Sequence, residues 1–130
     1  MNYLVDTHIL IWSLVEPEKL SFKMKEAILN EENTIYYSQF NLWEISIKYA
    51  LGKLELQKKT PEQFYEELEQ SFFKCKMIQN MELVTFYKLP FEHKDPFDRA
   101  LIWQAINNDL ILISSDGKIN EYEKYGLKHL

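Results

Sequence analysis

Four carboxylate residues are candidates for metal-assisted chemistry, because each falls at the end of an expected strand or near the start of an expected helix: Asp6, Glu44, Asp98 and Asp116. Four carboxylates in one place repel one another, and without a counter-charge some of them would be protonated. Mg²⁺ or Mn²⁺ accepts such oxygen ligands, lowers the pKa of a bound water and stabilises charge on phosphate oxygens. The chemistry that this set would support is hydrolysis of a phosphodiester bond.

The expected secondary structure brings three of these acids to one edge of a sheet. Asp6 ends the strand-like run at residues 3–5, and Asp116 closely follows the continuous apolar run at residues 110–114, which suits a strand buried on both faces of a parallel sheet. Glu44 lies in the second turn of a helix that starts after another strand, and its side chain leans back toward the helix N-terminus. In right-handed βαβ units these positions share the edge where ligand sites form.

Asp98 needs a separate explanation, because its helix follows another expected helix rather than a strand. Asp95 can cap this helix, Pro96 fits its first position, and Asp98 then lies in the first turn, at the positive end of the helix dipole. The helix leads directly into the run at residues 110–114, so its C-terminal end lies at the opposite edge. A length of about 13 residues, roughly 20 Å, returns Asp98 to the edge of the other three acids.

Each acid also has a structural explanation when it is taken alone. Three of them suit a helix cap, a dipole partner or a turn: Asp6, Asp98 and Asp116. Glu44 could pair with Lys48 four residues later, but such a pair is worth only about 0.2–0.5 kcal/mol, a poor reason to place a charge among apolar neighbours. Asp95 is interpreted as a cap and not as a member of the site.

Helix-like and strand-like segments alternate along the chain, which predicts a single domain over residues 1–130 with a three-layer α/β/α fold and a short, mostly parallel central sheet. Helices are expected at residues 7–15, 21–30, 38–51, 60–74, 81–88, 95–108 and 120–124. Strands are expected at residues 3–5, 34–37, 75–79, 110–114 and 127–130.

Composition limits the class of protein. With 130 residues, 46% of them apolar, and only three Gly and four Pro, the chain has material for one core and no linker-like stretch. Its longest purely apolar runs, such as residues 9–12, are far shorter than a membrane span, and no basic region precedes an apolar segment at the start. The lone Cys75 cannot form an internal disulfide. We therefore expect a cytoplasmic protein without a membrane partner.

The net charge of −5 counts mildly against nucleic-acid binding, which usually involves a basic surface. Bound divalent cations would offset the acidic ligands. A local basic stretch also lies between acidic ones: Lys48, Lys53, Lys58 and Lys59. These lysines either solvate the end of a helix or contact phosphate.

Other residues stay open between structural and functional roles. Ser114 and Thr7 can hydrogen-bond a ligand carboxylate or serve only local structure, and Arg99 can contact phosphate or pair with an acid. Three histidines lack a zinc-binding spacing and are expected in loops and at helix starts: His8, His93 and His129. The tryptophans are expected in the core or on a dimer face, and exposed aromatic residues such as Trp12 and Phe40 are candidates for that face. The tryptophans are Trp12, Trp43 and Trp103.

The chain resembles PIN-domain proteins over almost its whole length, with the motifs in the family's order. The most specific blocks are Trp43-Glu44-Ile45-Ser46-Ile47-Lys48 and Asp95-Pro96-Phe97-Asp98-Arg99. They are accompanied by Leu4-Val5-Asp6-Thr7-His8 near the start and Ser114-Ser115-Asp116 near the end. Among PIN-domain proteins, the chain is similar to the VapC-like toxins of type II toxin–antitoxin pairs.

This resemblance implies a Mg²⁺- or Mn²⁺-dependent endoribonuclease whose catalytic and metal-binding acids are Asp6, Glu44, Asp98 and Asp116. It also implies an RNA substrate, a homodimer, and a small antitoxin that wraps the toxin and blocks its acidic pocket. Ser114 stands where many relatives carry Thr, which keeps the hydroxyl, and Asn41 replaces a frequent small hydroxyl residue.

Two other functions are compatible with parts of the pattern. An aspartyl-nucleophile phosphohydrolase would use Asp6 to attack phosphorus, but such chemistry usually has a second acid two residues later, where this chain has His8. A non-catalytic PIN-like binding module would have lost its acids, and all four are present here.

Overall fold

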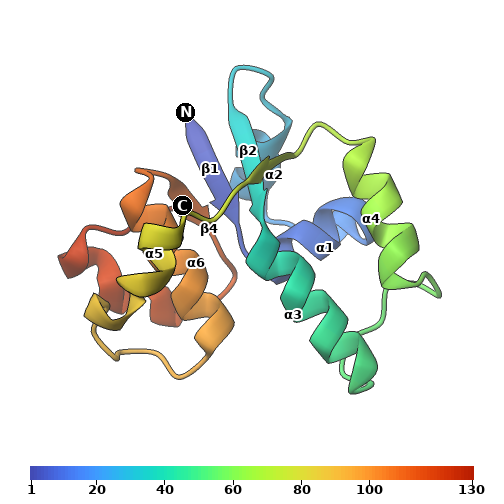
Figure 1. Ribbon diagram of the computed structural model, residues 1–130. Helices are drawn as coiled ribbons and strands as arrows, with labels where there is room; N and C mark the ends of the chain where they lie inside the picture. Colours follow the sequence, from blue (N-terminus) through green and yellow to red (C-terminus); the bar gives the residue numbers. More distant parts are fainter.

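The computed structural model describes residues 1–130 and contains one five-stranded sheet in the order β3-β2-β1-β4-β5, with helices on both sides (Figure 1). All four strand pairings are parallel. This confirms the predicted α/β fold and makes its sheet wholly rather than mostly parallel. The elements are β1 (Asn2–Val5), α1 (Thr7–Val15), η1 (Pro17–Lys19), α2 (Phe22–Leu29), β2 (Thr34–Ser38), α3 (Gln39–Ala50), α4 (Pro61–Glu69), β3 (Lys74–Lys76), α5 (Asn80–Val84), η2 (Phe86–Lys88), α6 (Pro96–Asn107), β4 (Ile111–Ile113), η3 (Gly117–Tyr125) and β5 (Lys128–His129).

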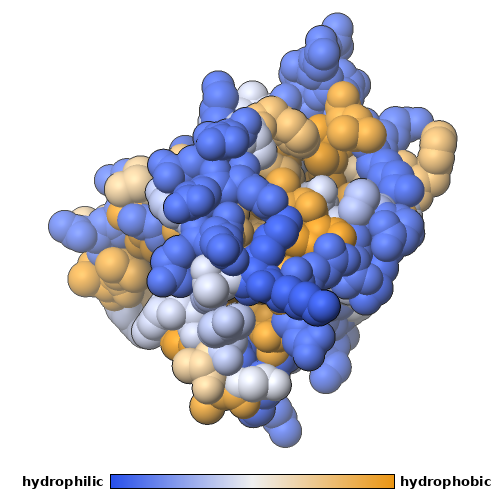
Figure 2. Space-filling model, turned by 90° about the vertical axis from the view of Figure 1, so that its right-hand side faces the viewer, coloured by the Kyte–Doolittle hydropathy of each residue, from blue (hydrophilic) through white to orange (hydrophobic).

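Apolar side chains remain exposed outside the core. Phe22, the first residue of α2, is 79% exposed. Phe72, near α2, is 55% exposed. Between α1, α2 and the segment after α4 there is a cavity of about 280 Å³ with mostly hydrophobic walls. On the side of the molecule that carries α1 and α4, apolar surface lies between hydrophilic side chains (Figure 2).

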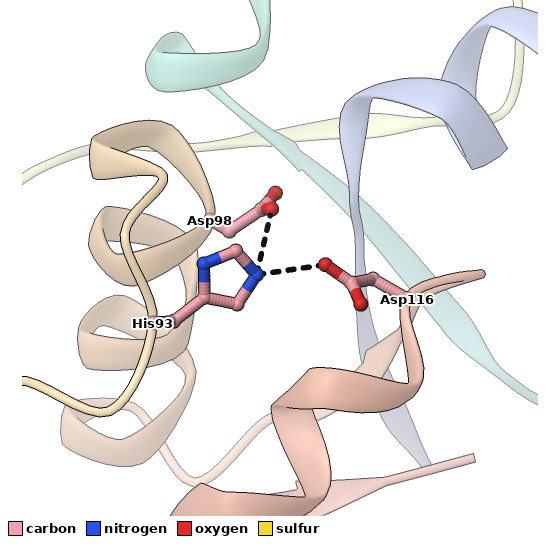
Figure 3. A group of neighbouring side chains, drawn as sticks. All are labelled: His93, Asp98 and Asp116. Atoms are coloured by element: carbon pink, nitrogen blue, oxygen red, sulfur yellow. Dashed lines mark hydrogen bonds and ion pairs between the residues drawn. The ribbon is translucent and has the colours of Figure 1, made fainter.

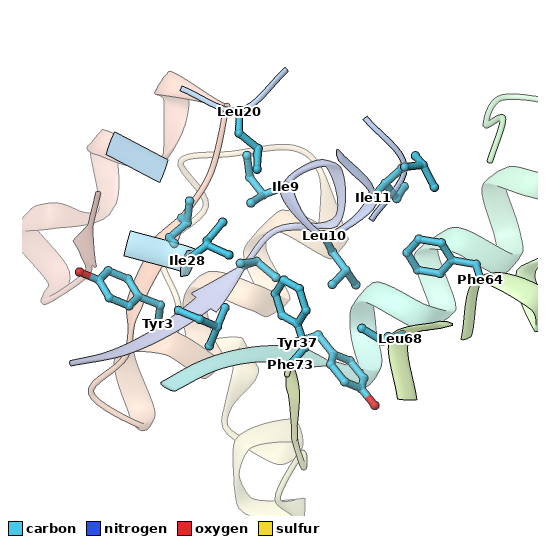
Figure 4. Close-up of a cluster of buried hydrophobic side chains, with 14 of the residues drawn as sticks. Tyr3, Ile9, Leu10, Ile11, Leu20, Ile28, Tyr37, Phe64, Leu68 and Phe73 are labelled. Carbon is cyan, nitrogen blue, oxygen red and sulfur yellow. The ribbon is translucent and has the colours of Figure 1, made fainter. Parts of the chain in front are cut away.

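The sheet separates two hydrophobic clusters, because successive side chains of a strand point to opposite faces. In the central strand β1, Tyr3 and Val5 join the cluster formed with α1, α2 and α4 (Figure 4), whereas Leu4 joins the cluster formed with α6, β4 and η3. Strand β4 follows the same alternation, with Leu112 and Ile113 in different clusters. Burial on both faces explains why these strands are almost wholly apolar.

Side-chain caps start the helices next to the sheet. Ser38 ends β2 and caps α3, since its Oγ accepts a hydrogen bond from the Phe40 N–H at 3.1 Å. The Asn41 side chain returns the interaction by accepting from the Ser38 N–H at 2.7 Å. Asp95 caps α6 and accepts from the N–H groups of Phe97 and Asp98, which confirms its predicted role.

Two predicted helices differ from the observed ones because a hydroxyl side chain competes for backbone groups. The helix expected at residues 60–74 ends at Glu69, and the Ser71 hydroxyl donates to the Leu68 carbonyl while accepting from the Phe73 N–H. The helix expected at residues 81–88 is divided at Thr85, whose hydroxyl donates to the Met81 carbonyl, into α5 and η2.

Smaller differences concern strand and helix bounds. The strand expected at residues 75–79 is Lys74–Lys76, and the helix expected at residues 120–124 lies within the longer 3₁₀ helix η3. The predicted edge strand at the C-terminus is present as β5 beside β4. None of the helices combines the length and the apolar character that a membrane span requires.

The central position of β1 generates a stability prediction. Leu4→Ala should lower the free energy of unfolding by about 2–5 kcal/mol, because Leu4 has no exposed surface and its loss leaves a cavity under α6. The matched variant Leu29→Ala, at a side chain that is 69% exposed, should change it by less than about 0.5 kcal/mol. Urea denaturation followed by circular dichroism would measure both. Equal effects of the two substitutions would contradict the assignment of the core.

Candidate active site

The topology brings the four predicted acids to the C-terminal edge of the sheet. Asp6 directly follows β1, Asp116 lies three residues after β4, and Glu44 and Asp98 come from the N-terminal halves of α3 and α6. A cavity of about 320 Å³ at this edge has no hydrophobic residue in its wall. The residues that line it are Asp6, His8, Glu44, Lys48, Asp95, Asp98, Ser115 and Asp116.

Asp6 is 4% exposed, and hydrogen bonds reach both of its carboxylate oxygens. Oδ1 accepts from the Ile9 N–H at 2.8 Å, so Asp6 also caps α1. Oδ2 accepts from the Ser114 hydroxyl at 2.6 Å and from the Ser115 N–H at 3.3 Å. Burial raises the pKa of Asp6 although these hydrogen bonds oppose the rise. Of the two roles considered for Ser114, the structure supports the first, because its hydroxyl donates a hydrogen bond to a carboxylate of the cavity.

Glu44 is 3% exposed and is held from two sides. The Thr7 hydroxyl donates to Oε1 at 2.5 Å and itself accepts from the Asn41 side-chain amide at 3.0 Å. Lys48 forms an ion pair with Oε2. Desolvation lowers the pKa of Lys48, but the hydrogen bond and charge of Glu44 outweigh it and raise the pKa. The expected ion pair between Glu44 and Lys48 is therefore present, and both residues line the cavity.

Asp98 carries the charge that is least well compensated. Burial raises its pKa from 3.8 to about 7, and the nearby carboxylates of Asp95 and Asp6 add to the rise. The His93 ring acts in the opposite direction. Asp95 contributes negative charge to the cavity wall even though its Oδ1 is used as the cap of α6.

His93 connects Asp98 and Asp116, and sequence reasoning missed it (Figure 3). The ring is 7% exposed, and its Nε2 lies 2.7 Å from Oδ2 of Asp116 and 3.3 Å from Oδ2 of Asp98. Burial acts to raise the pKa of Asp116, but hydrogen bonds from His93 and from the Lys118 N–H lower it. The available signal was the position of His93 two residues before the cap of α6, where one of the two most specific blocks of the sequence begins.

The donor set fits a hard divalent cation. The cavity presents carboxylate oxygens, which Mg²⁺ and Mn²⁺ prefer, and a bound cation would relieve the repulsion that raises the pKa of Asp98. One ligand atom from each of His93, Asp98 and Asp116 lies within 4.8 Å of the others. This spacing is compatible with the residues turning toward a common ion.

Several other candidates lie outside the cavity wall. Arg99 points away from the acids, since its guanidinium donates to the Leu89 carbonyl at 3.0 Å and stacks between the rings of Phe86 and Phe91. His129 lies near Glu123. Of the four lysines in the basic stretch, only Lys48 lines the cavity.

The aromatic residues are distributed differently from expectation. Trp12 and Phe40, which were expected to be exposed, are only partly exposed because they pack against the two hydrophobic clusters, and their place on a dimer face stays a prediction. Trp103 packs against the second cluster. Trp43 is 59% exposed and meets Phe97 edge to face at 5.4 Å, so it does not belong to the core.

Several solved structures share this fold. VapBC2 from Rickettsia felis bound to a DNA fragment from their promoter matches with 19% identity and a TM-score of 0.68, over 100% of this chain and 98% of that one. VapBC-1 from nontypeable Haemophilus influenzae matches with 18% identity and a TM-score of 0.67, over 100% and 97%. FitAcB from Neisseria gonorrhoeae matches with 17% identity and a TM-score of 0.67, over 100% and 96%.

A sequence comparison with curated proteins found no match. The model of the PIN domain, in contrast, matches residues 3–125, which include all four acids of the cavity. Because this match spans nearly the whole chain, the protein belongs to the PIN domain family.

Proposed function

We propose that this protein is a divalent-metal-dependent endoribonuclease that hydrolyses phosphodiester bonds in RNA. The observation that carries the proposal is the gathering of Asp6, Glu44, Asp98 and Asp116 around one polar cavity at the edge of the sheet where α/β proteins bind ligands. PIN domains are generally nucleases, and membership of this family supports the same reaction class.

Some residues of the cavity would bind a metal ion, and others contact these ligands. Asp6, Asp98 and Asp116 would hold Mg²⁺ or Mn²⁺, together with Glu44 directly or through water. When bound, the ion would lower the pKa of a water and neutralise charge on the phosphate. Lys48 keeps a positive charge next to Glu44, and its ammonium group is the cationic side chain in the wall that can attract a phosphate.

An exposed aromatic ring beside the acids favours an unpaired nucleic acid as substrate: Trp43 is 59% exposed, whereas the neighbouring Phe97 is half-buried. Trp43 immediately precedes Glu44 in α3, and Phe97 immediately precedes Asp98 in α6, so their edge-to-face pair joins the two helices next to the cavity. A base that has left its own stack can pack on such a ring. The choice of RNA over DNA rests on the resemblance to VapC-like ribonucleases.

The wider role that we propose is that of a toxin held inactive by a small antitoxin, with the chain acting as a homodimer in the cytoplasm. Two of the structures with this fold are of VapBC proteins, which supports a partner protein of the VapB kind. The apolar cavity between α1, α2 and the segment after α4 offers a surface on which a partner could bury side chains.

The alternative functions have less support. In an aspartyl-nucleophile phosphohydrolase Asp6 would attack phosphorus, and such chemistry usually has a second acid two residues later. The residue two positions later, His8, lines the cavity but adds no carboxylate. A binding module without activity would not need to keep four mutually repelling acids in one cavity.

Removal of one metal-binding acid should abolish cleavage without unfolding the protein. Asp6→Asn and Asp98→Asn should each lower kcat/KM for a fluorescent single-stranded RNA by about 10²–10⁴-fold, and EDTA should abolish cleavage by the unchanged protein. The matched control is Asp109→Asn, at an 82% exposed side chain before β4, at the opposite edge of the sheet. A DNA oligonucleotide of the same sequence tests the choice of RNA. Full activity of both site variants in EDTA would contradict the proposal.

The raised pKa of Asp98 predicts a pH-dependent gain in stability when its charge is removed. Because the folded-state pKa of Asp98, about 7, exceeds the ordinary value of 3.8, the unfolded chain loses this proton first, and the free energy of unfolding falls between about pH 4 and about pH 7. Asp98→Asn should therefore stabilise the metal-free protein at about pH 8, by at most about 4 kcal/mol, and have little effect at about pH 4. Urea denaturation in EDTA would measure this difference. An equal effect at both pH values would show that the ionised form of Asp98 does not destabilise the folded protein.

The toxin role predicts growth arrest when the chain is expressed alone in a bacterial host. Co-expression of the small protein encoded beside it should restore growth, because the partner would cover the acidic cavity. The Asp6→Asn variant should be harmless and should still bind the partner in a pull-down. If both the original chain and Asp6→Asn arrest growth equally, the arrest does not come from the proposed nuclease activity.

A further inference from the structure

The His93 ring is fixed at both of its nitrogen atoms. Nδ1 lies 3.0 Å from the backbone N–H of Asp95, which can only donate a hydrogen bond. Nδ1 must therefore present its lone pair, and the ring hydrogen of the neutral imidazole is carried by Nε2. That Nε2–H group points at Oδ2 of Asp116, 2.7 Å away, and toward Oδ2 of Asp98.

We propose that His93 is a positioning residue that holds Asp116 and Asp98 through its Nε2–H group, and that it is not itself a metal ligand. This inference rests on the proposed function for its consequence in metal binding. The ring joins two acids that come from different elements, α6 and the segment after β4. Without it, the carboxylate of Asp116 would keep only the hydrogen bond from the Lys118 N–H to its other oxygen.

The spacing of His93, Asp98 and Asp116 resembles a three-ligand metal site, but the tautomer opposes that interpretation. To bind a metal through Nε2, a neutral imidazole must carry its hydrogen on Nδ1. Two N–H groups, those of Nδ1 and of Asp95, would then face each other over 3.0 Å. This repulsion disfavours the ligating tautomer as long as the backbone stays in place.

The backbone around His93 is anchored from the opposite side. The hydroxyl of Tyr122 accepts hydrogen bonds from the N–H groups of Glu92 and His93 and donates to the Pro90 carbonyl. Tyr122 has no exposed surface. Because a buried side chain of η3 ties down the segment before α6, the backbone of His93 cannot shift to relieve the repulsion without breaking these bonds.

Two substitutions of His93 distinguish the roles of its two ring nitrogen atoms. His93→Asn keeps an acceptor for the Asp95 N–H but is too short to reach Asp116, whereas His93→Gln places an amide donor near the position of Nε2. We expect His93→Asn to weaken Mg²⁺ affinity by about 10–100-fold and His93→Gln to retain most of it, as measured by isothermal titration calorimetry. Equal losses in both variants, or no loss in His93→Asn, would overturn the positioning role. Thermal unfolding in EDTA would show that both variants are folded.

The tautomer itself can be observed by ¹⁵N NMR of the imidazole ring. The metal-free and the Mg²⁺-saturated protein should both show hydrogen on Nε2 and none on Nδ1. A metal-free ring with hydrogen on Nδ1, or a change to that form on adding Mg²⁺, would overturn the proposal. If the protein binds no Mg²⁺ at all, the proposed function fails, but the spectrum of the metal-free ring still decides the assignment of the Nε2–H donor.

Discussion

The burial of several carboxylates around one cavity is the constraint on which the active-site end of the molecule depends. The sheet and its helices place Asp6, Glu44 and Asp98 in partly or wholly desolvated positions around one cavity, where ionised groups are costly. Burial raises the pKa of Asp6, and burial together with the nearby carboxylates raises the pKa of Asp98, in keeping with that cost. The proposed divalent cation would offset this cost.

Hydrogen bonds from the surrounding residues stabilise the crowded carboxylates. Each buried carboxylate receives a short hydrogen bond from a neutral or cationic neighbour: Ser114 for Asp6, and Thr7 and Lys48 for Glu44. His93 does the same for Asp116. These contacts fix the directions of the carboxylate oxygens before any ion arrives, which reduces the ordering that metal binding requires.

The sequence predicted what depends on local patterns and on strand order. The caps Ser38 and Asp95, the buried strands and the convergence of the four acids all follow from periodicity and from the handedness of βαβ units. The role of His93 was not predictable in this way, because it depends on the path of a loop tied to Tyr122, thirty residues away in sequence. The orientation of Arg99 was equally hidden, since it follows from two aromatic rings that only the folded chain brings together.

Anomalous diffraction from a crystal soaked in Mn²⁺ can decide whether the four acids form a site for a divalent cation. We expect an anomalous peak in the cavity, coordinated by carboxylate oxygens that include those of Asp6 and Asp98, with His93 in contact with Asp116 rather than with the ion. A cavity without a peak at saturating Mn²⁺, or a peak coordinated only by residues outside the four acids, would contradict it.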